Sequence, residues 1–159
     1  MARLTCDADA LMQANADKVF GLDGWIDTAP FEDLVGITIE SASEGRAVLT
    51  FPFKVKLAQG LGVLHGGAMT TLADTAVAMA IKSLLPEGTI FATTDLAMEF
   101  LTPVRQGLVR AVAEVEGPFG RTFKGQAELF DDEDCLVARF TSTFRVARDQ
   151  GFTDETTLS

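Results

Sequence analysis

The organisation of the chain depends on residues 63–76, which read VLHGGAMTTLADTA. The run begins as a turn that contains the only histidine of the protein, His65, followed by two glycines. From Met69 to Leu85 apolar residues recur at steps of three and four, which predicts a helix with one buried face, and Pro86 stops it. A turn of small residues that opens a helix presents free backbone N–H groups, which favour a negative charge.

Length and composition are typical of one globular domain. The chain has 159 residues, of which 47% are apolar, so it can bury a sizeable core. A formal net charge of −10 argues against a broad basic face for nucleic acid. It leaves room for an anionic small ligand, which needs only a local basic patch.

The sequence lacks the patterns of a metal site, a membrane span and a signal peptide. Cys6 and Cys135 lack the spacing of metal ligands, and a single histidine leaves little for a zinc site. No apolar run approaches the roughly 18 residues that a membrane span needs, and three aspartates interrupt the first 20 residues, unlike a signal peptide. We expect a cytoplasmic protein with no metal and no membrane partner.

Hydrophobic periodicity predicts a mixed α+β fold, in which one antiparallel sheet packs on one buried helix. A short amphipathic helix is predicted over 7–20, and Phe31 to Leu34 lead into a first strand that alternates over 35–40. The remaining predicted elements are a return strand at 47–53, the central helix, and four strands at 89–101, 108–115, 122–130 and 135–146. We divide the chain into an N-terminal helix and connector (1–30), a main domain (31–147) and a polar C-terminal tail (148–159).

The distance between two residues of the central helix limits what one subunit can do. Gly66 and Asp74 are separated by roughly 12 Å along the axis. A carbonyl held by the Gly66 N–H needs its nucleophile or base within about 3 Å. If both residues act on one substrate, two antiparallel helices from two subunits must supply them, which makes a dimer with two composite sites.

The helix face around Asp74 favours contact with a partner, because its residues are small or apolar where a solvated face would carry Lys and Glu. These residues are Thr70, Thr71, Thr75, Ala78 and Met79. The alternative is that Asp74 is an ordinary polar residue on an exposed face.

The run from Gln59 through Leu64-His65-Gly66-Gly67 to Leu72-Ala73-Asp74-Thr75-Ala76 resembles the hotdog-fold acyl-CoA thioesterases. It is most similar to their phenylacetate-degradation (PaaI-like) subgroup, and more distantly to the 4-hydroxybenzoyl-CoA type. That second type tends to have glutamate at the place of Asp74 and threonine at the place of Ala78, so the chain departs from it. The resemblance covers roughly 31–146 and implies a sheet wrapped around the central helix.

The resemblance implies catalytic roles for five residues. The Gly66 N–H would hold the oxyanion, and Asp74 of the opposite subunit would attack the thioester carbonyl or activate a water. Gln59 would orient substrate or water, although a loop amide that caps the backbone is the alternative. His65 would shape the glycine turn through a ring hydrogen bond rather than transfer a proton, and Thr93 would place a hydroxyl near the carboxylate unless it is a plain strand threonine.

The resemblance also implies an acyl-CoA substrate with an aryl, phenylacetyl-type or short-to-medium acyl group. Gly67, Arg121, Lys124 and Arg105 are the candidates for substrate binding, the three cations for the CoA phosphates. No cofactor is implied beyond the CoA of the substrate, and the implied assembly is a homodimer doubled into a homotetramer. Two rival functions stay open: a hotdog acyl-thioester hydratase or dehydratase that uses His65, and an acyl-CoA-binding module without turnover.

Overall fold

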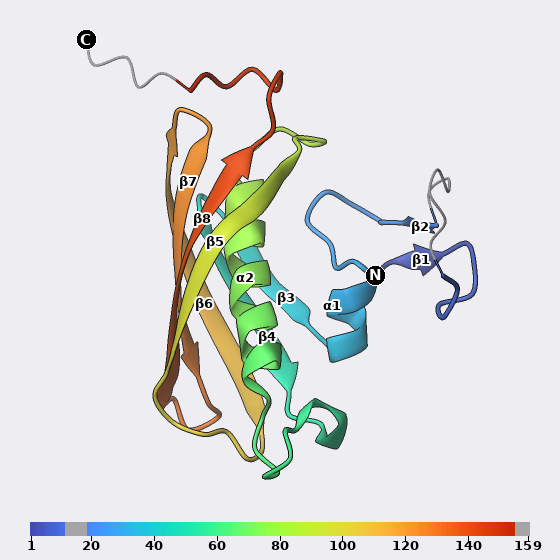
Figure 1. The fold of residues 1–159 in the computed structure, drawn as a ribbon, viewed down its shortest axis with the longest axis vertical. Coiled ribbons are helices and arrows are strands. Elements are labelled where there is room, and N and C mark those ends of the chain that lie inside the picture. The colour runs from blue at the N-terminus through green and yellow to red at the C-terminus, as the bar shows by residue number, and fades with distance from the viewer. Residues whose placement is uncertain (12–18, 155–159) are drawn as a thin grey trace.

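A six-stranded antiparallel sheet curves around one long helix in the computed structural model, which describes residues 1–11 and 19–154 (Figure 1). The long helix is α2 (Gly66–Lys82), and the strand order in the sheet is β3-β4-β6-β7-β8-β5. The strands are β3 (Thr38–Ser43), β4 (Arg46–Pro52), β5 (Phe91–Phe100), β6 (Leu108–Phe119), β7 (Thr122–Phe130) and β8 (Leu136–Val146). This confirms the predicted α+β class.

Smaller elements lie on the α2 side of the sheet. They are β1 (Arg3–Leu4) paired with β2 (Phe20–Gly21), the helix α1 (Pro30–Val35), and a 3-10 turn η1 (Val55–Leu57). Figure 1 shows β1, β2 and α1 beside the layer that α2 and the sheet form. Within the described ranges, no helix is both long and apolar enough to cross a membrane.

The core lies between α2 and the concave face of the sheet. Because residues three and four apart share a helix face, the apolar spacing after Gly66 directs one side of α2 inward. Fully buried side chains from α2 and from the strands meet there: Leu72, Val77, Ile81, Phe51, Phe123 and Phe140.

One glycine allows α2 to approach the sheet closely. Gly125 lies in the middle of β7, and a Cβ added to it would overlap Cγ1 of Val77 and come within 3.1 Å of the Ser142 hydroxyl. These neighbours belong to α2 and to the adjoining strand β8, which the core holds in place.

We expect Gly125→Ala to lower the free energy of unfolding by about 1–3 kcal/mol, since one extra methyl overfills a closed core. Urea unfolding followed by circular dichroism measures this effect. Gly60→Ala is the matched control, because nothing lies within 4 Å of a Cβ at that position. Equal stability of the two variants would contradict the close helix–sheet packing described here.

The N-terminal third differs from the sequence prediction. The first strand, predicted over 35–40 with residues 31–34 leading into it, was placed too early: α1 includes residues 31–35, and the strand begins at Thr38. The middle of the helix predicted over 7–20 lies outside the described residues; at its ends, residues 7–10 form a turn and Phe20 pairs with Leu4.

Local signals account for α1. Pro30 occupies the first turn, where its missing N–H is not needed, and Glu32 and Asp33 follow at the positive end of the helix dipole. Gly36 ends the helix in the left-handed conformation, with φ of 86°, and its N–H donates to the carbonyls of Glu32 and Asp33. In the sequence, the alternation of Val35, Ile37 and Ile39 favours a strand, and the prediction followed this pattern instead of the helix signals.

Candidate active site

The turn before α2 leaves one backbone N–H available. His65 caps the helix, because its Nδ1 accepts the N–H of Gly67 at 2.8 Å. The His65 N–H donates to the Leu57 carbonyl, which anchors the turn. Gly66 is the first residue of α2, and its N–H has no acceptor in the part of the chain that the structure describes. An N–H at a helix N-terminus is suited to hold an oxyanion.

An apolar groove of about 390 Å³ opens beside Gly66. Its walls include Leu64, Met69, Phe100, Leu101 and Val104. The Phe100 ring lies directly over the turn, since a Cβ on Gly66 would be 2.9 Å from its Cζ. Gln59 also lines this groove, and its Oε1 accepts the Leu61 N–H, so its side chain supports the loop as well.

Asp74 lies two turns further along α2 and faces β5. The Thr93 hydroxyl donates to its Oδ1 at 2.9 Å, so the hydroxyl lies beside the carboxylate, the arrangement that the resemblance implies. Burial raises the pKa of the Asp74 carboxyl above its ordinary value, the Thr93 hydrogen bond opposes this, and the charge of Glu32 adds to it. A half-buried carboxylate with a raised pKa and a fixed orientation is a reasonable nucleophile or base.

A second groove, of about 440 Å³, runs along α2 from Asp74 toward its C-terminus. Thr93, Phe91 and Ile90 of the β5 side form one wall, and Ala78 and Lys82 of α2 form another. Trp25 and Glu32, from the N-terminal segment, complete it. Sequence analysis did not include Trp25, Glu32 or Lys82 among the site residues; the single tryptophan of the chain was the available signal.

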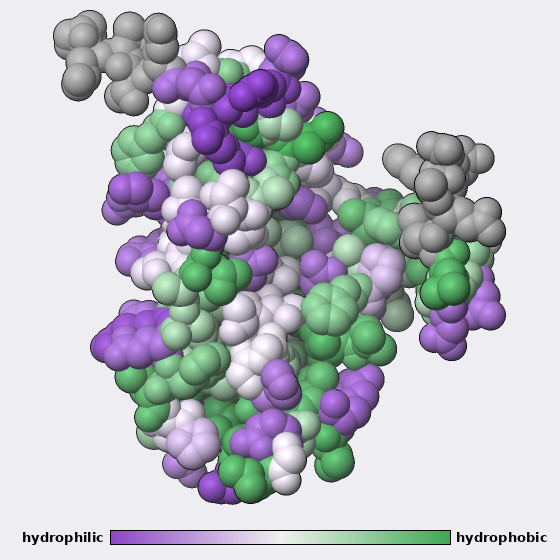
Figure 2. All heavy atoms as spheres, viewed as in Figure 1, coloured by the Kyte–Doolittle hydropathy of each residue, from purple (hydrophilic) through white to green (hydrophobic). Residues whose placement is uncertain are grey.

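A single subunit does not bring Gly66 and Asp74 together. They line different grooves that share no residue, and roughly 12 Å of helix axis separates them. Figure 2 shows that hydrophilic side chains gather toward the rim of the α2 face, while the spheres over its middle are mostly white and pale green. The face is therefore suited to contact with another protein surface.

Two of the residues predicted to bind substrate already have partners. The Gly67 N–H donates to His65, so it is not available to a ligand. Arg121 is only 8% exposed. Its Nε and Nη2 donate to the Asp154 carboxylate at 2.8 and 3.0 Å, and its Nη1 donates to the Val146 carbonyl. In this structure Arg121 holds the C-terminal segment against the sheet.

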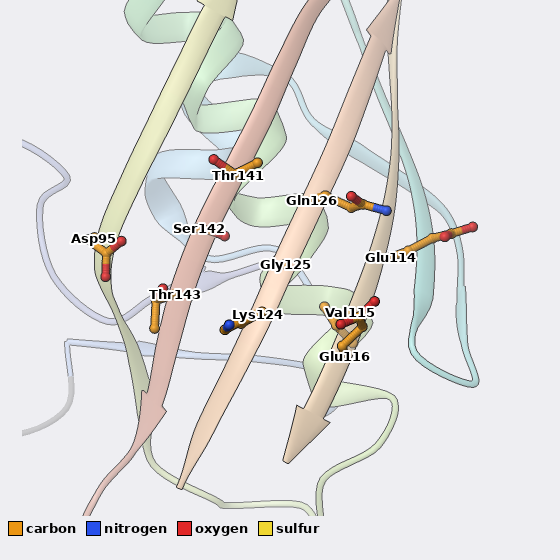
Figure 3. A pocket seen from close by; sticks show the side chains of 10 residues that line it. All are labelled: Asp95, Glu114, Val115, Glu116, Lys124, Gly125, Gln126, Thr141, Ser142 and Thr143. Carbon is orange, nitrogen blue, oxygen red and sulfur yellow. The ribbon is translucent and has the colours of Figure 1, made fainter. Parts of the chain in front are cut away.

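The other two predicted cations lie away from both grooves. Lys124 lies on the face of the sheet opposite α2, in a polar depression with Glu114, Glu116 and Asp95 (Figure 3). Arg105 is exposed in the loop between β5 and β6. The structure therefore does not gather Arg121, Lys124 and Arg105 into one phosphate site.

Comparisons with known proteins show the family to which the chain belongs. The thioesterase superfamily model matches residues 61–138, which contain α2 and the turn before it. The chain is 34% identical over 118 residues to the 1,4-dihydroxy-2-naphthoyl-CoA hydrolase of Listeria monocytogenes, covering 74% of this chain and 95% of the relative. It is 32% identical over 107 residues to the acyl-coenzyme A thioesterase PaaI of Escherichia coli, covering 67% and 74% of the two chains.

A solved structure of the Escherichia coli PaaI protein superposes with a TM-score of 0.69 at 28% identity, covering 79% of this chain and 87% of that one. The chain belongs to the thioesterase superfamily and has the hotdog fold that the resemblance implied. Its reaction class is thioester hydrolysis.

Proposed function

We propose that the protein is an acyl-CoA thioesterase whose active site forms between two subunits. Asp74 of one subunit and the Gly66 N–H of the other would act on the same thioester carbonyl. The observation that carries this proposal is the pairing of α2 with β5: Asp74 is hydrogen-bonded to Thr93, and Gly66 lies under Phe100. Both site residues thus contact the same strand, β5, at two positions, Thr93 and Phe100, that are seven residues apart.

The open edge of that strand supports a two-fold dimer. β5 is the last strand of the sheet and has ten residues, and Leu96 and Phe100 on it are 46% and 56% exposed. A long exposed edge strand invites pairing with another chain. If two copies of β5 pair antiparallel about a centre near Leu96 and Ala97, Thr93 of one subunit lies close to Phe100 of the other. Asp74 then lies beside the partner's Gly66.

The chemistry follows from this arrangement. The Asp74 carboxylate, or a water that it deprotonates, attacks the carbonyl carbon, and the carbonyl electron pair moves to the oxygen held by the Gly66 N–H. Collapse of this intermediate expels the CoA thiolate, which takes the proton that Asp74 removed from the attacking water or, if Asp74 itself attacked, a proton from solvent water. If Asp74 itself attacks, water then cleaves the acyl–Asp74 anhydride to the free acid. A dimer is the smallest assembly that completes the site, and a tetramer would contain two such pairs.

The nature of the acyl group is part of the proposal. Aryl, phenylacetyl-type and short-to-medium acyl groups suit grooves of about 390 and 440 Å³. The two relatives described above are named for hydrolysis of an aromatic acyl-CoA and of acyl-CoA in general.

Release of free thiol from a panel of CoA esters tests the proposed function. The panel contains phenylacetyl, hydroxybenzoyl, short-chain and long-chain esters, and we expect turnover of at least one ester from the first three groups. Hydration of crotonyl-CoA, followed by absorbance, tests the rival hydratase. His65 Nδ1 already accepts the Gly67 N–H, which disfavours that rival. Tight binding of an ester without release of thiol would support a binding module instead.

The pH dependence of kcat/KM should respond in opposite directions to two neighbours of Asp74. Thr93→Val removes the hydrogen bond that lowers the Asp74 pKa, so the acid limb of the profile should move to higher pH. Glu32→Gln removes a charge that raises this pKa, so the limb should move to lower pH. Profiles measured for both variants beside the wild type check this. Shifts in the same direction would show that the limb does not belong to Asp74.

A further inference from the structure

The Asp74 groove contains a wall that the family match does not include. The thioesterase model matches residues 61–138, whereas Trp25 comes from the connector between β2 and α1, and Glu32 comes from α1 itself. Figure 1 shows this connector on the same side of the sheet as α2. Residues outside this matched segment that line the same groove as Asp74 are placed to decide which substrates the site accepts.

Trp25 is fixed to the end of α2 by three contacts with Lys82. The indole Nε1–H donates to the Lys82 carbonyl at 3.0 Å, and the Lys82 Nζ donates to the Trp25 carbonyl at 2.9 Å. The Nζ also lies 4.7 Å from the centroid of the indole ring, within cation–π range. The reciprocal hydrogen bonds hold the ring at the end of the groove that lies furthest from Asp74, roughly 12 Å along the helix axis.

The Lys82 end of the groove is closed by the Trp25 ring and is also polar. Within residues 1–11 and 19–154, no carboxylate oxygen lies within 4.0 Å of the Lys82 Nζ. Burial lowers the pKa of Lys82, and the charges of Glu32 and Asp27 oppose this. An alkyl chain that reached this point would press against the indole and remove water from a charged ammonium group, which is unfavourable.

The acyl group, rather than CoA, is the part of the substrate that suits this groove. Asp74 and Glu32 both line it, and with the single ammonium of Lys82 they leave the groove with a net negative charge, which disfavours the phosphates of CoA. The groove begins at the residue that would attack the carbonyl, so a group bonded to that carbonyl enters it directly.

We propose that Trp25, held by Lys82, is the specificity-determining wall of the Asp74 groove and restricts the substrate to compact acyl groups. This inference rests on the proposed function, because it takes Asp74 as the group that attacks the carbonyl. The ligand class is a short- to medium-chain or single-ring acyl group, and straight chains long enough to pass Ala78 and reach the indole are rejected.

The test compares kcat/KM for acyl-CoA esters from acetyl to decanoyl, together with phenylacetyl-CoA. In Trp25→Ala, the ratio of decanoyl to phenylacetyl activity should rise at least about 10-fold, since a few methylenes that fit or clash change discrimination by that much. Lys82→Met removes the charge and keeps the length of the side chain, and it should raise the same ratio. Ala78→Leu narrows the groove and should lower the ratio of phenylacetyl to acetyl activity.

Phe130→Ala is the matched control. Phe130 is the other ring with a cation over its face in the described chain, with Arg110 5.2 Å from its centroid, and it lines neither groove. The Phe130→Ala variant should have the same ratio of decanoyl to phenylacetyl activity as the wild type. Melting temperatures of all variants show whether each one folds. If Trp25→Ala does not fold, the role of Trp25 is decided by three other variants: Trp25→Phe, Lys82→Met and Ala78→Leu.

Two further measurements separate this inference from the proposed function. Thioesters of N-acetylcysteamine lack the phosphates of CoA, and the altered ratio should persist with them. Two results would overturn the inference. One is a ratio of decanoyl to phenylacetyl activity that is unchanged in the folded variants. The other is an equal effect on all acyl groups that disappears with N-acetylcysteamine esters. If the wild type hydrolyses no ester, the proposed function fails. The dissociation constants of non-hydrolysable thioether analogues of increasing chain length then still show whether Trp25 limits the acyl group.

Discussion

Asp74→Asn is expected to lower kcat for thioester hydrolysis by about 10³–10⁴, the loss typical for removal of a catalytic carboxylate or nucleophile. Asparagine has nearly the same shape and its oxygen can still accept the Thr93 hydroxyl at the place of Oδ1. Only the negative charge and the nucleophilic oxygen are lost. Release of thiol from the best ester of the panel measures the effect.

Asp95→Asn is the control for this variant, because Asp95 lies on the opposite face of the sheet (Figure 3). Its activity should match that of the wild type. Equal activity of Asp74→Asn and the wild type would remove Asp74 from the mechanism.

The same substitution should stabilise the fold. Because burial raises the Asp74 pKa above 3.8, the folded state binds the proton more tightly than the unfolded state. Ionisation at neutral pH therefore lowers stability, and Asp74→Asn should melt at a higher temperature than the wild type at pH 7. The difference should narrow as the pH falls through the raised pKa of the folded state and below 3.8, where both states of the wild type are protonated. An inactive but more stable variant is the signature of a functional carboxylate.

Gly66→Pro is expected to lower kcat by about 10²–10³, because it removes the backbone N–H proposed to hold the oxyanion. Proline is favoured at the first position of a helix, which Gly66 occupies. His65, before it, has φ of −64° and ψ of 132°, the conformation that a following proline requires. The substitution therefore removes one hydrogen-bond donor and leaves α2 able to form.

Gly66→Ala separates the effect of added atoms from that of the missing donor. Both variants bring a Cβ against Phe100, whose exposed ring must move aside, but only the proline variant lacks the N–H. Alanine should retain most of the activity. A loss as large as that of proline would assign the effect to displacement of Phe100 instead of the N–H.

Sequence periodicity was sufficient for the main fold because each of its elements has one buried face. Apolar steps of three and four gave α2. Alternation gave β6 and β8, and runs bounded by turns gave β4, β5 and β7, with boundaries within about four residues. The distance between Gly66 and Asp74 also followed from helix geometry alone, so the separation into two grooves could be expected before the structure.

Long-range contacts could not be predicted in the same way. Nothing local in the sequence indicates that Trp25 meets Lys82, 57 residues later, or that Asp154 binds Arg121, 33 residues earlier. Arg121 was a candidate phosphate ligand because the family that the chain resembles often has a basic residue in this turn. Its burial depends on how the C-terminal segment crosses the end of the sheet. The helix signals of α1 were local and therefore readable in the sequence, but the alternation around Val35 led to the prediction of a strand there.

Complementation between the two inactive variants tests the composite site most directly. A heterodimer of Asp74→Asn and Gly66→Pro subunits, purified with two different tags, contains one site with both defects and one site with neither. We predict that it recovers about half of the wild-type activity per dimer, since the intact Asp74 of one subunit meets the intact Gly66 N–H of the other. Activity as low as that of either parent would contradict a site shared between subunits.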